Sequence, residues 1–107
     1  MDTADVVVVG AGAGGLATAV TAAHEGLSVV VLERAEVCGG ATAWSGGWMW
    51  APGNPLAHAE GVVEDVEEFR TYLRGVLGEH YDADRVDAFL AAAPHMVGFF
   101  HERTALK

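Results

Sequence analysis

The stretch VVVVGAGAGGLATAVTAA, residues 6–23, decides the fold of this chain. It holds no charged residue over 18 positions, about the length that crosses a lipid bilayer. Four glycines interrupt its middle, and each costs about 1 kcal/mol of helix propensity relative to alanine. Asp2 and Asp5 precede it and no Lys or Arg occurs before Arg34, so the flank is wrong for a signal peptide. We therefore interpret the stretch as two elements with a glycine-rich joint.

The two elements on either side of this joint are a strand and a helix. Residues 5–9 are apolar and β-branched after Asp5, as in a strand that helices cover on both faces. After the joint, apolar residues recur at spacings of three and four, which predicts a helix that packs on a sheet through Ala13, Leu16, Ala17, Val20 and Ala23. Gly26 offers a stop for this helix, and residues 28–33, SVVVLE, predict a second strand.

The joint has the spacing G-x-G-x-x-G and lies inside a strand, turn, helix, strand unit. Gly10 permits a tight turn, Gly12 lets the backbone approach a pyrophosphate, and Gly15 lets the helix pack close to the strand. The helix N-terminus offers N–H groups to phosphates, and Glu33 can accept hydrogen bonds from ribose hydroxyls. This arrangement predicts dinucleotide binding. The candidate residues here are Gly10, Ala11, Gly12, Ala13, Gly14, Gly15, Glu33 and Arg34.

The identity of the dinucleotide depends on the residues after the second strand. Glu33 would repel a 2′-phosphate, which disfavours NADP and leaves FAD or NAD. Residues 33–55 carry two glycine pairs, Gly39–Gly40 and Gly46–Gly47, with Thr42 and Ser45 between them. Such small residues allow backbone N–H groups to lie against a long cofactor, which favours FAD. The alternative, an irregular loop in which the glycines only turn corners, stays open on spacing alone.

These motifs resemble a known family. VVVVGAGAGG, VLE, GGATAWSGG and WMWAPGN are similar to the N-terminal FAD-binding segment of flavoproteins that include fumarate reductase, soluble flavocytochromes and 3-ketosteroid dehydrogenases. GVVEDVEEFRTYLRGVLG and FFHERTALK are similar to the ketosteroid dehydrogenase branch, so the resemblance covers the whole chain. It implies a Rossmann-like α/β fold in a larger two-domain enzyme. It also implies that residues along the cofactor toward the flavin ring include Gly39, Gly40, Ala41, Thr42, Ser45, Gly46 and Gly47.

The resemblance carries expectations about chemistry. It implies hydride transfer between FAD and a carbon beside an activated group, as 3-ketosteroid-type dehydrogenation or fumarate-type C=C reduction. Residues 39–47 contain no histidine, which in the respiratory members carries the flavin covalently, so we expect noncovalent FAD. The implied substrate is a steroid-like ketone or an unsaturated acid. The catalytic tyrosines of the steroid branch are expected after residue 107, and no catalytic residue is assigned within the chain.

The second half of the chain predicts helices. An apolar face at helical spacing is formed by Val66, Phe69, Tyr72, Leu73, Val76 and Leu77. A second helix follows a cap at Asp82 or Asp84, and Pro94 is expected to end or kink it, with a third short helix beyond. We expect one cofactor-binding part, residues 1–55, and a helical extension, residues 56–107, of the same FAD domain.

Composition limits the partners. The formal net charge of −9 disfavours nucleic acid and anionic lipid. The single Cys38 forms no internal disulfide, which fits a reducing cytoplasm, and the five histidines show no metal-binding spacing. Two strands that are apolar on both faces need more neighbours in a sheet, so we expect the chain to be the front part of a larger flavoenzyme. We expect the 107-residue chain to be inactive on its own. The alternatives are an NAD-binding Rossmann module and a non-catalytic fragment with the family fold.

Overall fold

The computed structural model describes residues 3–107, which form two compact units. The first unit ends at Met49, and the second comprises Trp50–Lys107. The division therefore lies a few residues before residue 55, where the sequence placed the end of the cofactor-binding part. Each unit is described by itself below.

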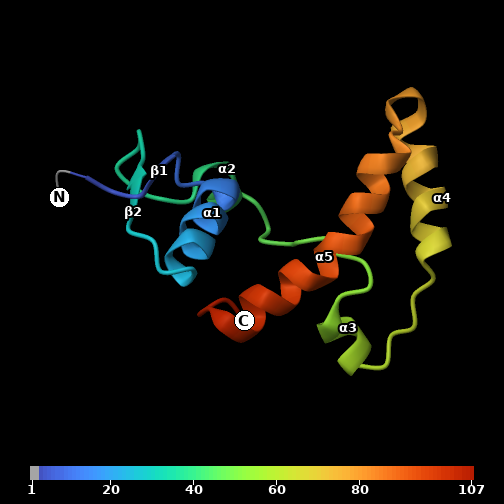
Figure 1. Cartoon of the computed structure of the whole chain (residues 1–107). Helices are drawn as coiled ribbons and strands as arrows, with labels where there is room; N and C mark the ends of the chain where they lie inside the picture. Colours follow the sequence, from blue (N-terminus) through green and yellow to red (C-terminus); the bar gives the residue numbers. More distant parts are fainter. Residues whose placement is uncertain (1–2) are drawn as a thin grey trace. The chain divides into compact units, whose positions relative to one another are not determined.

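The first unit is built on two parallel strands. β1 (Val6–Val9) pairs with β2 (Val29–Leu32), with Val6 opposite Val29 and Val9 opposite Leu32. Valine favours extended backbone because its branched Cβ fits a pleated sheet. The helix α1 (Ala13–His24) connects the strands and lies along them, as Figure 1 shows. This strand, helix, strand unit confirms the α/β class, and α1 ends just before Gly26, as expected.

One face of the small sheet is covered and the other is open within this chain. Val8 is buried, whereas Val7, Val9 and Leu32 are 57%, 84% and 53% exposed. The sequence predicted strands covered on both faces, and the described residues supply a cover for one of them. The open valines are the apolar surface that further elements of a parallel sheet ordinarily cover.

The observed packing face of α1 differs in part from the predicted one. Leu16 and Val20, two members of the predicted stripe, are 38% and 39% exposed, whereas Ala19 is buried. Ala17 of the predicted stripe is half-buried, as are Gly15 and Ala22, and the spacings of four and three place Gly15, Ala19 and Ala22 on one face of the helix. Small residues on this face allow the backbone of the helix to lie close to the strands, as the 3.3 Å distance from an added Gly15 Cβ to Val8 Cγ1 shows.

The second unit consists of helices. α3 (Pro55–Ala59) begins at Asn54, whose side chain accepts hydrogen bonds from the N–H groups of Leu56 and Ala57. α4 (Val66–Leu77) begins at the capping carboxylate of Asp65, and the short 3₁₀ helix η1 (Gly78–His80) follows it. Figure 1 shows α4 beside the first part of α5 (Ala83–Arg103), joined through η1. Asp82 caps α5, which confirms one of the two predicted caps.

Pro94 neither ends α5 nor separates a third helix from it. The helix runs from Ala83 through Pro94 to Arg103, so the predicted third helix is its second half. A proline inside a helix removes one backbone hydrogen bond. Here burial on both sides of Pro94 compensates for this loss, because Leu90, Ala93 and Val97 are all buried. Burial of the hydrophobic face of α5 therefore stabilises the helix more than Pro94 destabilises it.

The core of the second unit is small. Ala93 and Val97 of α5 pack with Ala51, and Met96 covers them. Nearer the N-terminus of α5, an ion pair joins this helix to α4, with Arg70 Nε 2.6 Å from Asp87 Oδ1. The apolar face predicted for α4 is only partly covered, since Tyr72 and Val76 are 59% and 63% exposed.

Among residues 3–107, no helix combines the length and the apolar character that crossing a membrane requires. The charge-free stretch at residues 6–23 is instead divided into β1, a turn and most of α1. The glycines at the turn separate the two elements, as the sequence indicated.

Candidate cofactor site

The turn between β1 and α1, residues 10–15, is called here the first glycine segment. Gly10 has a φ of +98°, which L side chains rarely adopt, and its N–H donates to the carbonyl of Leu32 at 2.7 Å. Ala11 follows with no exposed surface, and Gly12 immediately precedes α1 as its N-cap. The turn therefore carries the chain directly from the end of β1 into the start of the helix.

Gly15 is the point of closest approach between α1 and this turn. A Cβ atom at Gly15 would lie 1.9 Å from the carbonyl oxygen of Gly10 and 3.3 Å from Val8 Cγ1. No side chain fits at that distance. The geometry agrees with the packing role that the G-x-G-x-x-G spacing predicts for this glycine.

Gly12 and Gly14, unlike Gly15, lie beside open space. A Cβ atom at either position would meet nothing within 4 Å, so the backbone at the start of α1 borders open space. Within the described residues, no side chain caps this N-terminus and its first turn holds no acidic residue. The positive end of the helix dipole is thus left for an anion, and the missing side chains let that anion approach the backbone.

Glu33 follows β2 and reaches back to the first glycine segment. Its Oε2 accepts a hydrogen bond from the N–H of Ala11 at 2.7 Å, and its Oε1 accepts one from Ala35 at 2.8 Å. These N–H groups of Ala35 and Ala11 lower the pKa of the Glu33 carboxyl, which is ionised at neutral pH. Each oxygen has a second lone pair, so the carboxylate can still accept two hydroxyl groups.

Sequence reasoning missed Ala35 as part of this site. Its contribution is a backbone N–H group, which every residue except proline carries, so the alanine side chain gives no signal. The only hint is its position two residues after the acidic residue that ends the strand.

Residues 39–47 form the second glycine segment, and its start lies against the first. The N–H of Gly39 donates to the carbonyl of Ala11 at 2.7 Å, and a Cβ atom on Gly40 would lie 3.4 Å from Gly12 Cα. The open alternative of an irregular loop is wrong for part of this segment, because residues Gly40–Trp44 form the helix α2. The first N–H groups of a helix have no partner within it, so the start of α2 can still offer backbone donors, and Gly39 and Gly40 allow it to start against the first segment.

The structure brings together some predicted site residues and leaves others apart. Gly10 through Gly15, Glu33, Gly39 and Gly40 form one connected group. Arg34 is exposed beside Glu33, where its charge contributes slightly to the lowered pKa of that carboxyl. The remaining candidates are exposed and bond locally: Ser45 Oγ donates to the carbonyl of Thr42 at 2.7 Å and accepts from the N–H of Gly47 at 3.1 Å. Ala41 and Gly46 share this exposed position.

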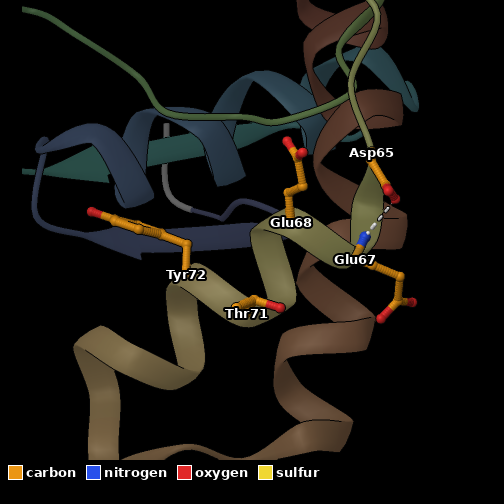
Figure 2. Close-up of a pocket in the computed structure, with 5 residues that line it drawn as sticks. All are labelled: Asp65, Glu67, Glu68, Thr71 and Tyr72. Carbon is orange, nitrogen blue, oxygen red and sulfur yellow. Dashed lines mark hydrogen bonds between the residues drawn. The ribbon is translucent and has the colours of Figure 1, made fainter.

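A surface depression on α4 contrasts with the glycine segments. Figure 2 shows it lined by Asp65, Glu67, Glu68, Thr71 and Tyr72. Asp65 uses its Oδ1 to accept the N–H of Glu67 at 2.9 Å, and the carboxylates of this surface repel a phosphate group. The depression is therefore unfavourable for the phosphate groups of a dinucleotide.

Comparison with known proteins agrees with this geometry. A family model described as "FAD binding domain" matches residues 5–106. A 3-oxosteroid 1-dehydrogenase from Mycobacterium tuberculosis is 48% identical over 103 residues, covering 96% of this chain and 18% of that protein. A urocanate reductase from Eggerthella lenta is 42% identical over 90 residues, covering 83% of this chain and 15% of that protein. These matches confirm the resemblance that the sequence motifs indicated.

A solved structure gives the same result. The 3-ketosteroid delta1-dehydrogenase from Sterolibacterium denitrificans, in complex with 1,4-androstadiene-3,17-dione, matches with a TM-score of 0.80 and 38% identity. The match covers 94% of this chain and 18% of that chain. The chain thus spans about a fifth of the length of these relatives. The family model indicates FAD as the cofactor, as expected from the sequence, and by this match the chain belongs to the FAD binding domain family.

Proposed function

We propose that this chain binds the adenosine diphosphate part of noncovalent FAD and forms the cofactor-binding part of a flavin-dependent oxidoreductase. One observation carries the proposal: the open N-terminus of α1 at Gly12 lies beside the Glu33 carboxylate and the start of the second glycine segment. An uncapped helix N-terminus suits the pyrophosphate, and a carboxylate with spare lone pairs suits the two ribose hydroxyls.

The other predicted residues have roles in the same proposal. Gly10, Ala11, Ala13, Gly14 and Gly15 shape the turn, and Arg34 borders the ribose side. The second glycine segment follows the cofactor toward its flavin ring, through Gly39, Gly40, Ala41, Thr42, Ser45, Gly46 and Gly47. Noncovalent attachment is supported by the lack of histidine in residues 39–47. We assign residues 1–55 to the cofactor-binding part and residues 56–107 to its helical extension.

Bound FAD would supply hydride transfer to or from a carbon beside an activated group. The names of the relatives support a steroid-like ketone or an unsaturated acid as the substrate of the whole enzyme, since they include 3-oxosteroid 1-dehydrogenase and urocanate reductase. The residues of this chain bind and orient the cofactor, and we assign no catalytic group among them. A cytoplasmic location is the one we propose, from the single unpaired cysteine.

The test is a binding titration of the 107-residue chain with ADP, FAD and NAD. Binding is measured by calorimetry and by the shift in the thermal unfolding temperature. Gly12→Ala adds a methyl group in open space, so it leaves the fold intact and obstructs the pyrophosphate. We expect it to weaken ADP and FAD binding about tenfold or more, which corresponds to about 1.4 kcal/mol. Gly75→Ala in α4 is the matched control, because its Cβ also meets nothing and it lies outside the site.

Three results would contradict the proposal. The first is a folded chain that binds neither ADP nor FAD, which would favour a non-catalytic fragment. The second is binding that Gly12→Ala and Gly75→Ala leave equally unchanged. The third is binding of NAD and ADP without FAD, which would favour the NAD-binding Rossmann module.

A further inference from the structure

We propose that Glu33 is a positioning residue that fixes the start of the second glycine segment through the backbone of Ala11, before any nucleotide binds. The inference deepens the proposed function and rests on it, because the segment that Glu33 fixes belongs to the proposed cofactor site. It assigns to the carboxylate a second role, separate from accepting ribose hydroxyls.

The argument begins with the two backbone groups of Ala11. Its N–H donates to Glu33 Oε2 at 2.7 Å, and its carbonyl accepts from the N–H of Gly39 at 2.7 Å. Ala11 has no exposed surface, so water cannot replace either partner without opening the unit. Glu33, Ala11 and Gly39 therefore form one continuous chain of hydrogen bonds between three separate segments.

The far end of this chain is the start of α2. Gly39 immediately precedes α2 as its N-cap, and a Cβ atom added to the next residue, Gly40, would lie 3.4 Å from Gly12 Cα. Apart from this approach, α2 is short and exposed, so it gains little from packing of its own. The orientation of the Ala11 carbonyl thus determines where the second glycine segment starts.

A carboxylate is required because both of its oxygens accept backbone N–H groups, one from Ala11 and one from Ala35. Hydrogen bonds to an ionised acceptor are shorter and stronger than neutral ones. A glutamine at this position has one acceptor oxygen, and its NH₂ group would face the other N–H as donor against donor. Glu33→Gln therefore disrupts the chain of hydrogen bonds while keeping nearly the same shape.

The experiment measures amide hydrogen exchange by NMR in the 107-residue chain without nucleotide. The readout is the exchange rate of the Gly39 amide, compared with that of Leu27, whose N–H donates to the carbonyl of Ala22 at 3.1 Å at the far end of α1. We expect Glu33→Gln to accelerate Gly39 exchange about tenfold or more and to leave Leu27 within about twofold. Glu36→Gln removes the same charge from an exposed neighbour, and we expect it to change neither rate.

Two outcomes would overturn the inference. If Glu33→Gln leaves the Gly39 rate unchanged, the carboxylate does not hold the second segment. If the variant accelerates Gly39 and Leu27 equally, Glu33 only stabilises the unit as a whole. Neither outcome depends on nucleotide binding, so failure here is distinguishable from failure of the proposed function, which the Gly12→Ala titration tests.

Discussion

A methyl group on Gly15 would lie 1.9 Å from the carbonyl oxygen of Gly10, far inside van der Waals contact. The oxygen belongs to the backbone of the first glycine segment, so relief requires a shift of the turn or of α1. We expect Gly15→Ala to lower the free energy of unfolding by about 2–3 kcal/mol, measured by urea denaturation followed by circular dichroism.

Gly14→Ala is the matched control for this clash. Both glycines lie in α1, and a Cβ on Gly14 meets nothing within 4 Å. We expect Gly14→Ala to raise stability by up to about 1 kcal/mol, because alanine has the higher helix propensity. Equal denaturation midpoints for the two variants would mean that α1 does not approach the turn this closely.

Asp5 and Ser28 hold the starts of the two parallel strands together. The Ser28 hydroxyl donates to Asp5 Oδ2 at 2.6 Å and the Ser28 N–H donates to the same oxygen at 2.8 Å. These two bonds, the hydroxyl first, lower the pKa of Asp5 below its ordinary value of 3.8. A lowered folded-state pKa contributes stability that is present above the unfolded value and lost as the pH falls through the folded value.

We therefore expect thermal stability to fall as the pH is lowered below the ordinary value of 3.8 and through the lowered pKa at which Asp5 becomes protonated in the folded chain. Asp5→Asn removes this contribution, so the variant is less stable than the wild type at pH 6 and loses less between pH 6 and pH 3. The pKa of Glu33 is also lowered, from an ordinary value of 4.5, and its acid sensitivity remains in the variant. Parallel pH profiles for the two proteins would show that the Asp5–Ser28 pair does not stabilise the fold.

Trp50 is the aromatic centre of the second unit. Its ring lies 5.8 Å from that of Phe89, nearly parallel, and 5.9 Å from those of Phe69 and Tyr72. Because the side chain is half exposed, we expect Trp50→Ala to cost about 1–3 kcal/mol rather than the full cost of a buried tryptophan. Trp48→Ala, at a residue 96% exposed, should change stability by less than about 0.5 kcal/mol. Similar losses for both, in chemical denaturation, would contradict the packing role.

The first unit was predictable from the sequence where side chains or glycines carry the signal. Residues 5–9 and 28–33 were predicted as strands, and the structure has Val6–Val9 and Val29–Leu32, because runs of valine favour extended backbone. Glycine adopts the positive φ of Gly10 without strain, and only a residue without a side chain fits the close approach at Gly15. Glycines at these spacings therefore indicate a turn and a close backbone approach directly from the sequence.

The features that were not predicted depend on small side chains and on backbone groups that give no residue-specific signal in the sequence. The packing face of α1 was partly misplaced because hydrophobic spacing favours the large residues Leu16 and Val20 over the small Ala19 and Ala22, although the glycine motif correctly placed Gly15 against the strand. The links from Glu33 to Ala35 and from Ala11 to Gly39 use backbone N–H and carbonyl groups that nearly all residues share. Residue spacing could place Glu33 near the turn, but it could not show which backbone groups meet it.

The prediction that Pro94 could end its helix was also wrong, and it leads to the last prediction. Proline has no N–H to donate to the carbonyl of Leu90, four residues earlier in α5, and this costs about 3 kcal/mol in a helix interior. The ring is half-buried and lies near Gly53, because a Cβ atom added to Gly53 would be 3.7 Å from Pro94 Cγ. Pro94→Ala restores the hydrogen bond and loses part of this contact, so we expect a net gain of about 1–2 kcal/mol in chemical denaturation.

Pro55→Ala gives the comparison for this gain. Pro55 is the first residue of α3, where the helix needs no N–H from it, and its fixed φ favours the helical start. Its replacement should lower stability by up to about 1 kcal/mol, because the unfolded chain gains freedom and no bond forms in exchange. A loss of stability in Pro94→Ala as well would mean that the contact of the Pro94 ring near Gly53 contributes more than the missing hydrogen bond costs, and that α5 retains its proline for packing.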